Sequence, residues 1–324
     1  MSLKPIYQIL PLSIRELIQS LPRTILGCLE EIRVRQGRPL EIITSEQSWF
    51  VSKSCQLSMK PKDSMFPNKE DCQKMLNLIS NHSLYTMEEE LRQGYVTVEG
   101  GHRIGLVGKV VVEKGKVKHI REVTGFNIRV ARQVMGVGEG LISYLISGED
   151  VENLLLVSPP QCGKTTLIRD LARLASTGGR LFRSRKVGIV DERSEIAGCV
   201  DGVPQHDVGP RTDVLDACPK AEGMMMMIRS MSPEILVVDE IGRQEDSLAV
   251  HEAVYSGVHL FTTAHGSSLE EICHRPILSG LIHEGIFSRI VLLSRRRGPG
   301  TIEGIYNESL QPVPLPSQKV VYTR

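Results

Sequence analysis

The feature that most constrains the fold is an apolar run that leads into a turn of small residues, a Lys-Thr pair and a further apolar segment. The run is 154–157, and the segment after it reads Ser158-Pro159-Pro160-Gln161-Cys162-Gly163-Lys164-Thr165-Thr166. In a strand–loop–helix of this kind, backbone N–H groups surround phosphate oxygens, and the helix adds the positive end of its dipole. The segment therefore predicts a buried strand, a phosphate-binding loop and a helix over 167–174.

We assign all nine residues of 158–166 to nucleotide binding. Lys164 is expected to reach the β- and γ-phosphates of ATP, and the Thr165 hydroxyl to hold Mg²⁺. Ser158 departs from the usual pattern, which has glycine there because glycine adopts unusual backbone dihedrals and allows close approach. Serine is small, so the departure weakens the prediction only slightly. The alternative is an ordinary strand–turn–helix with a chance Gly-Lys-Thr.

A second apolar run, 234–238, ends in two acids followed by Ile-Gly. Such a run is typical of a buried parallel strand whose carboxyl end faces a site. We expect Asp239 to hold Mg²⁺ through water, and Glu240 to act as general base on the attacking water. The alternative is a strand that ends in a solvated Asp-Glu turn.

Two more runs end in polar residues. The run 187–190 ends in Asp191 and Glu192, with Glu195 nearby, and these acids could approach the γ-phosphate or an adjoining subunit. Glu192 therefore competes with Glu240 for the role of base, unless 191–196 is only a capped, salt-bridged turn. The run 259–264 ends at His265, which could bind the γ-phosphate or could be an ordinary surface histidine.

Together, segments 158–166, 190–198, 238–242 and 262–266 resemble the secretion-ATPase branch of the RecA-like motors. Those motors carry a phosphate loop, an acidic box, an acidic second nucleotide motif and a histidine box in that order. A closer resemblance is to the stage III sporulation protein AA family, on segments 31–40, 100–108, 191–198 and 203–216. The resemblance covers nearly the whole chain and implies an α/β, RecA-like three-layer P-loop NTPase domain.

The resemblance also implies a biological role. It implies a cytoplasmic Mg²⁺-dependent ATPase on the mother-cell side during endospore formation, which energises a secretion-like channel between mother cell and forespore. It implies a ring-shaped homo-oligomer, taken to be a hexamer, that associates with the membrane through a membrane-protein partner of the channel complex.

A ring motor needs positive charge from a neighbouring subunit to stabilise the transition state. Arg211 is our first candidate, because it lies in the loop 209–213 between two nucleotide motifs. Other arginines remain open: Arg229, Arg243, Arg275 and Arg289, and in the first domain Arg103, Arg121, Arg129 and Arg132.

Composition argues against a nucleic-acid partner. The chain has 39 basic and 38 acidic residues, a net charge of +1 and only 4% aromatic residues, so it is neither strongly basic nor rich in stacking side chains. A nucleic-acid translocase or remodelling ATPase is therefore the second hypothesis, and a nucleotide-gated scaffold with negligible hydrolysis is the third. Seven cysteines without a metal-ligand spacing indicate a reducing cytosol.

No apolar stretch approaches 18 residues, and 1–10 lacks the pattern of a signal peptide. Any membrane role is therefore expected to act through a partner, without direct transmembrane insertion.

We expect four parts in the chain. An N-terminal α+β domain, 1–133, is followed by a glycine-rich linker with a short helix, 134–150. The ATPase domain, 151–308, alternates strands and helices (one over 244–255), which predicts a parallel sheet in three layers. A tail, 309–324, is expected to dock on a neighbour. In the first domain we expect helices over 11–19, 71–80 and 86–93, a loop over 52–71, and strands over 31–34, 41–44, 95–98, 103–108, 109–112, 117–120 and 126–130.

Overall fold

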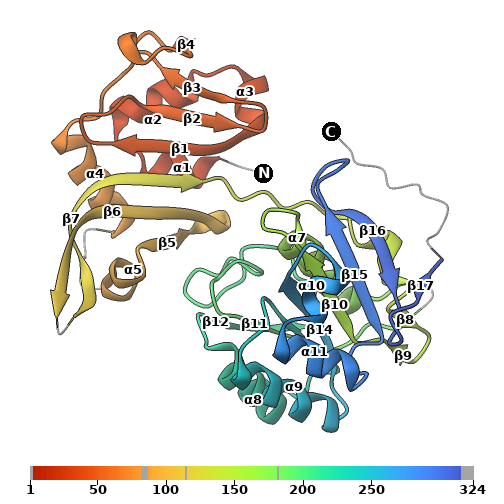
Figure 1. Cartoon of the computed structure of the whole chain (residues 1–324). Helices are drawn as coiled ribbons and strands as arrows, with labels where there is room; N and C mark the ends of the chain where they lie inside the picture. The colour runs from red at the N-terminus through yellow and green to blue at the C-terminus, as the bar shows by residue number, and fades with distance from the viewer. Residues whose placement is uncertain (1–2, 82–86, 114, 181, 315–324) are drawn as a thin grey trace. The chain divides into compact units, whose positions relative to one another are not determined.

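The structure is a computed structural model that describes residues 3–81, 87–113, 115–180 and 182–314. The chain divides into two compact units, Met1–Arg132 and Gln133–Arg324. Each unit has its own main sheet (Figure 1). One cluster of buried apolar residues lies in the first unit and two lie in the second. The two units are therefore described separately.

The first unit combines a seven-stranded sheet with short helices. The strand order is β4-β3-β2-β1-β7-β6-β5, and each neighbouring pair is antiparallel. The strands are β1 Leu29–Arg35, β2 Glu41–Thr44, β3 Ser48–Val51, β4 Leu57–Ser58, β5 Tyr95–Val98, β6 His102–Glu113 and β7 Lys116–Arg129. The helices are α1 Lys4–Ile9, α2 Leu12–Gln19, α3 Arg23–Cys28, α4 Lys69–Ile79 and α5 Glu88–Gln93, with 3-10 turns at Pro61–Asp63 and Glu99–Gly101.

The core of this unit follows from the spacing of its apolar residues. In β1, Leu29, Ile32 and Val34 are buried. They share one core with Ile14 and Ile18 of α2, which lie one helical turn apart. The sheet and helix therefore bury the faces that the sequence pattern makes apolar.

Helix α4 begins at Lys69, two residues before the start expected at 71. Asn68 caps it, because its side chain accepts a hydrogen bond from the Asp71 backbone N–H, and the Asp71 carboxylate accepts one from the Asn68 N–H. This reciprocal capping box fixes the helix start.

Four strands expected between 103 and 130 form two long strands instead. Residues 102–113 make β6, which pairs with β7 through three register shifts. At Gly108 a Cβ atom would lie only 1.8 Å from the backbone oxygen of Glu122. Glycine lets the two backbones approach at this irregular point, so the strands continue where the sequence pattern suggested breaks.

The second unit is built on an eight-stranded sheet of order β12-β11-β13-β14-β10-β15-β16-β17, with a small β8-β9 pair beside it. The strands are β8 Ile146–Ser147, β9 Asp150–Val151, β10 Leu154–Ser158, β11 Val187–Asp191, β12 Thr212–Asp216, β13 Ile235–Val238, β14 His259–His265, β15 Arg289–Ser294, β16 Thr301–Tyr306 and β17 Pro312–Val313. The helices are α6 Glu139–Ile142, α7 Lys164–Thr177, α8 Lys220–Met231, α9 Gln244–Tyr255, α10 Leu269–Cys273 and α11 Pro276–His283.

The neighbouring strands from β12 to β15 pair in parallel, as expected from the alternation of strands and helices. The last two strands, β16 and β17, are antiparallel. Their connections are hairpin loops, which are too short for the crossover that a parallel pair requires. The sheet is therefore mixed at this edge.

Alternating residues of β10 face two separate cores. Leu154 and Leu156 pack in one core with residues of α7, whereas Leu155 and Val157 pack in the other with residues of α8, α9 and α11. Because helices cover both faces of the sheet, the unit has three layers.

Residues 134–150, expected as a linker, lie within the second unit, and its α6 is the short helix expected there. Leu141 and Leu145 are buried in the core that contains Leu154 and Leu156 of β10. In the expected tail, Pro312 and Val313 pair with β16. The docking role suggested for this tail falls mainly on 315–324, which lie outside the described residues.

The helices of both units are short. The longest helix over the described ranges, α7, has 14 residues. Within those ranges, no helix combines the length and apolar character needed to cross a membrane.

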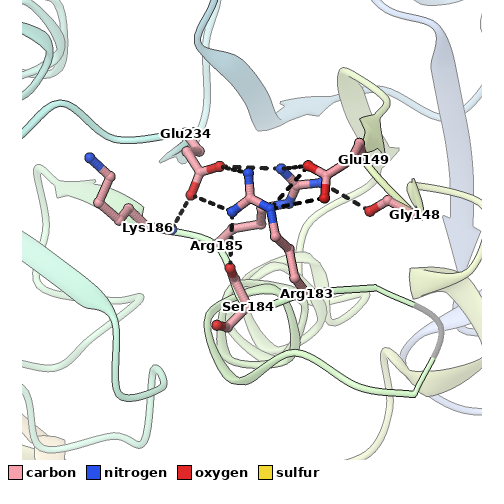
Figure 2. Close-up of polar contacts among 7 residues, drawn as sticks. All are labelled: Gly148, Glu149, Arg183, Ser184, Arg185, Lys186 and Glu234. Carbon is pink, nitrogen blue, oxygen red and sulfur yellow. Dashed lines mark hydrogen bonds and ion pairs between the residues drawn. The ribbon is translucent and has the colours of Figure 1, made fainter.

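An ion-pair cluster joins the amino ends of β11 and β13 (Figure 2). Arg185 is only 5% exposed, and it contacts Glu234 at 3.2 Å and Glu149 at 3.3 Å. Arg183 contacts the same two carboxylates, and the backbone N–H of Lys186 donates to Glu234. Burial opposes ionisation of Glu234, but these hydrogen bonds outweigh it and lower its pKa to about 2.

We expect Glu234→Gln to lower the free energy of unfolding of the second unit by about 2 kcal/mol at pH 7, because it leaves buried Arg185 poorly paired. Since its pKa is lowered from 4.5, the Glu234 contribution is present above pH 4.5 and is lost as pH falls towards 2. The difference between wild type and variant in urea denaturation should shrink over that range. Glu149→Gln is the control, because Glu149 is 74% exposed and its replacement should lower the free energy of unfolding much less. An equal loss of unfolding free energy in both variants would contradict the prediction.

Candidate nucleotide-binding site

The predicted phosphate-binding loop lies at the carboxyl edge of the parallel strands. It follows β10, whose last residue, Ser158, is in register with His265 at the end of β14. The next strands along the sheet, β13 and β11, end just before Asp239 and at Asp191. Because parallel strands share this edge, residues from four distant segments come together there.

The backbone of the loop shows where glycine is required. Gly163 has φ +86° and caps α7, and Gln161 also lies in the left-handed region at φ +59°. Ser158 has no positive φ and is buried at the end of β10. Serine is thus accommodated without backbone strain at the position where the usual motif has glycine.

Lys164, the first residue of α7, turns back over the loop. Its Nζ lies 3.1 Å from the backbone oxygen of Ser158 and 3.4 Å from Nδ1 of His265. Burial lowers the pKa of Lys164, and the carboxylates of Asp239 and Glu240 oppose that shift. Gly163 has no side chain to cap the helix, so the first N–H groups of α7 and this ammonium form a positive site.

Thr165 and Asp239 fit the expected Mg²⁺ site. The Thr165 hydroxyl lies 3.3 Å from one carboxylate oxygen of Asp239, and the other oxygen accepts a hydrogen bond from Thr263. Mg²⁺ prefers oxygen ligands and is usually bound by one or two protein groups, waters and substrate phosphates. No cluster of three or more His, Cys, Asp or Glu suited to a metal occurs among the described residues. The hydroxyl of Thr165 and the carboxylate of Asp239 are oxygen ligands of the kind that would hold a Mg²⁺ ion also bound to phosphate.

Glu240 follows Asp239 and is held on both sides. Its Oε1 lies 2.7 Å from Nε2 of His265, and its Oε2 lies 2.9 Å from Nη1 of Arg193. Its backbone has φ +53°, a conformation that costs energy for a residue other than glycine. The structure therefore brings Lys164, Thr165, Asp239, Glu240 and His265 together.

Glu192, the alternative base, forms its ion pair with a lysine, whereas Glu240 pairs with an arginine. Its carboxylate lies 3.0 Å from Nζ of Lys220, a buried lysine at the start of α8. The same Nζ donates to the backbone oxygen of Glu240 at 2.8 Å. Lys220 thus links the two candidate acids, and it neutralises Glu192 directly.

The Asp191 carboxylate stabilises the turn that follows β11. Its carboxylate accepts hydrogen bonds from the backbone N–H groups of Glu195, Ile196 and Ala197. Burial raises its pKa, and these hydrogen bonds oppose that shift. Arg169 of α7 donates to the backbone oxygens of Glu195 and Ile196, and burial lowers its pKa to about 10. The side chain of Asp191 is therefore occupied in supporting the acidic turn.

Arg211 lies away from this group. It precedes β12, and its backbone oxygen accepts from the N–H of Val187, the first residue of β11. It is therefore at the amino edge of the sheet, about 16 Å from the carboxyl edge for a five-residue strand. The structure does not bring Arg211 to the phosphate-binding loop of its own subunit.

The sequence patterns gave Arg193, Lys220, Thr263 and Gly300 no role at the site. Gly300, in the β15–β16 hairpin, donates its N–H to the backbone oxygen of Cys162 at 2.8 Å. A Cβ on Gly163 would lie 3.1 Å from the Gly300 nitrogen, so this hairpin braces the outside of the loop. Two of these residues had a usable signal in the sequence: Arg193 directly follows the acids Asp191 and Glu192, and Thr263 stands near the other polar residues at the end of β14.

The protein-family model described as "Sporulation stage III, protein AA" matches residues 2–313 of this chain. The chain belongs to this family. A relative, Stage III sporulation protein AA of Bacillus subtilis (strain 168), is 49% identical over 303 residues, which cover 94% of each chain. The resemblance expected from segments 31–40, 100–108, 191–198 and 203–216 is confirmed.

Two solved structures resemble this family member in fold. The Legionella pneumophila ATPase DotB has a TM-score of 0.57 and 15% identity, over 87% of this chain and 76% of DotB. The pilus retraction motor PilT, solved with ADP, has a TM-score of 0.53 and 15% identity, over 89% of this chain and 77% of PilT. They confirm the α/β RecA-like ATPase fold predicted from the sequence.

Proposed function

We propose that this family member is a Mg²⁺-dependent ATPase that converts ATP and water to ADP and phosphate. The observation that carries the proposal is the convergence of Lys164, Thr165, Asp239, Glu240 and His265 at one edge of the sheet. Each of these side chains has the chemistry that phosphoryl transfer to water requires. The solved neighbours, an ATPase and a motor with bound ADP, agree with this activity.

The proposed roles follow from the contacts. The loop N–H groups, the start of α7 and the Lys164 ammonium bind the β- and γ-phosphates, and His265 meets the γ-phosphate from β14. Thr165 and Asp239 hold Mg²⁺, which neutralises phosphate charge. Glu240 takes a proton from the attacking water while the γ-phosphoryl group moves to that water's oxygen and ADP departs.

The motor would act as a ring. We propose a homo-oligomer, and a hexamer in particular, in which an arginine of one subunit reaches the nucleotide of the next. Arg211 suits such a role in trans, because it is exposed beside edge strand β12 and far from its own loop. Its position in a neighbour's site is part of the proposal.

The family points to the cellular task. We propose that hydrolysis energises a secretion-like channel between mother cell and forespore, with the protein on the cytoplasmic, mother-cell side. A membrane protein of that channel would be its partner and would bring it to the membrane.

We expect purified protein to release phosphate from ATP only with Mg²⁺, and the rate per subunit to rise with protein concentration as shared sites assemble. A chelator should stop turnover, because it removes the divalent cation that Thr165 and Asp239 are proposed to hold and that neutralises phosphate charge. The measurement is phosphate release across protein concentration, with and without chelator. Tight ATP binding without phosphate release would support the nucleotide-gated scaffold. DNA-stimulated turnover that falls steeply with salt would support the nucleic-acid translocase.

A further inference from the structure

Glu240 is held at every polar atom. Its carboxylate oxygens meet His265 and Arg193, its backbone N–H donates to the Thr263 hydroxyl at 2.9 Å, and its backbone oxygen accepts from Lys220. This set of contacts holds the residue in its left-handed backbone conformation.

The two side-chain partners of Glu240 come from opposite directions. Strand β13, which leads to Glu240, lies between β11 and β14. His265 ends β14 and stands beside Lys164 of the phosphate-binding loop, whereas Arg193 follows β11 on the other side. His265 is thus the partner on the phosphate side, and Arg193 is the partner on the far side.

The two side-chain partners of Glu240 have different surroundings. His265 contacts Oε1 of Glu240 through Nε2 and Lys164 through Nδ1, so it belongs to the phosphate-binding arrangement. Arg193 contacts Oε2 through its guanidinium, which stays protonated.

A general base must bind the attacking water at a carboxylate oxygen. The Arg193 guanidinium, at 2.9 Å, occupies Oε2 of Glu240 and therefore competes with a water for that oxygen. Arg193 is 55% exposed, and its restraint can therefore be removed from outside without opening the core.

We propose that Arg193 is a positioning residue that restrains Glu240, and that moving its guanidinium away from Oε2 sets the rate of hydrolysis. The proposal rests on the ATPase function proposed above. The chemical group that would relieve the restraint is a carboxylate on an adjoining protein surface, because it would compete with Glu240 for the same guanidinium.

The test compares Arg193→Gln, Arg193→Lys and wild type. Arg193→Gln should raise kcat at least fivefold, with KM for ATP and the affinity for a fluorescent ATP analogue within twofold of wild type. Arg193→Lys keeps a charge near Oε2 and should return most of the restraint. Thermal unfolding of each variant shows that the fold is retained.

Arg183→Gln is the matched control. Arg183 also pairs with a glutamate, Glu149, at 3.0 Å, it is 50% exposed, and it lies in the ion-pair cluster at the amino ends of β11 and β13. Its loss should leave kcat unchanged. The gain from Arg193→Gln should also vanish when it is combined with Glu240→Gln, because the restraint acts only through that carboxylate.

An unchanged or lower kcat in Arg193→Gln would overturn the proposal. So would a gain that persists in the double variant with Glu240→Gln. Failure of the underlying ATPase function has a different signature: ATP binding and turnover would then be the same with and without Lys164. That result would remove both proposals.

Discussion

Lys164→Ala should lower ATP turnover by about 100- to 1,000-fold, the size of effect seen when one preorganised group at the developing charge is lost. Lys164 is the cation at the start of α7 and is held over the loop by Ser158 and His265. Its ammonium is expected to move from these contacts to the β- and γ-phosphates. Phosphate release under saturating Mg²⁺-ATP is the measurement.

Lys186→Ala controls for the loss of a lysine elsewhere in the same unit. The Lys186 side chain is exposed, and the contacts with Glu234 of the ion-pair cluster come from the Lys186 backbone N–H and backbone oxygen (Figure 2). This variant should retain wild-type turnover. Normal turnover by Lys164→Ala, with a retained fold, would show that the site has been assigned to the wrong residues.

Glu240→Gln should lower kcat by about 100-fold or more, because general base catalysis contributes roughly that much. The amide keeps the size of the side chain but cannot take a proton from water. ATP should therefore still bind, with a Kd within about threefold of wild type, and it should remain uncleaved. Single-turnover cleavage of labelled ATP, measured beside equilibrium binding, separates the two effects.

Glu192→Gln decides between the two candidate bases. Glu192 contacts Lys220 at the start of α8, whereas Glu240 contacts His265 beside Lys164 of the phosphate-binding loop. Replacement of Glu192 should therefore lower kcat less than about tenfold. If Glu192→Gln stopped cleavage while Glu240→Gln retained it, the roles of the two acids would be exchanged.

Local patterns predicted the elements whose signals lie within a few residues. The helix over 244–255 matches α9, and the buried run before Ser158 is β10. Predictions were less accurate where a contact distant in sequence decided the outcome. The separate strands expected over 103–130 became β6 and β7, because their irregular pairing depends on close approach at Gly108.

The site residues show the same contrast between what local sequence patterns predict and what contacts distant in sequence decide. Ser158 and His265 are the last residues of β10 and β14, and Asp239 directly follows β13. Parallel strands bring such positions to one edge of a sheet. Arg211 precedes its strand and therefore lies at the opposite edge. A prediction based on its neighbouring motifs could not detect that difference.

The amino-acid sequence by itself determined the family, the RecA-like three-layer class and the candidate residues of the nucleotide site, because these depend on short motifs and on the alternation of strands and helices. Only the tertiary structure decided which of these residues touch. Strand β13 lies between β11 and β14, although β11, β13 and β14 are separated along the chain by helices and loops. That spatial order places Glu240 between Arg193 and His265 and joins Glu192 to Lys220.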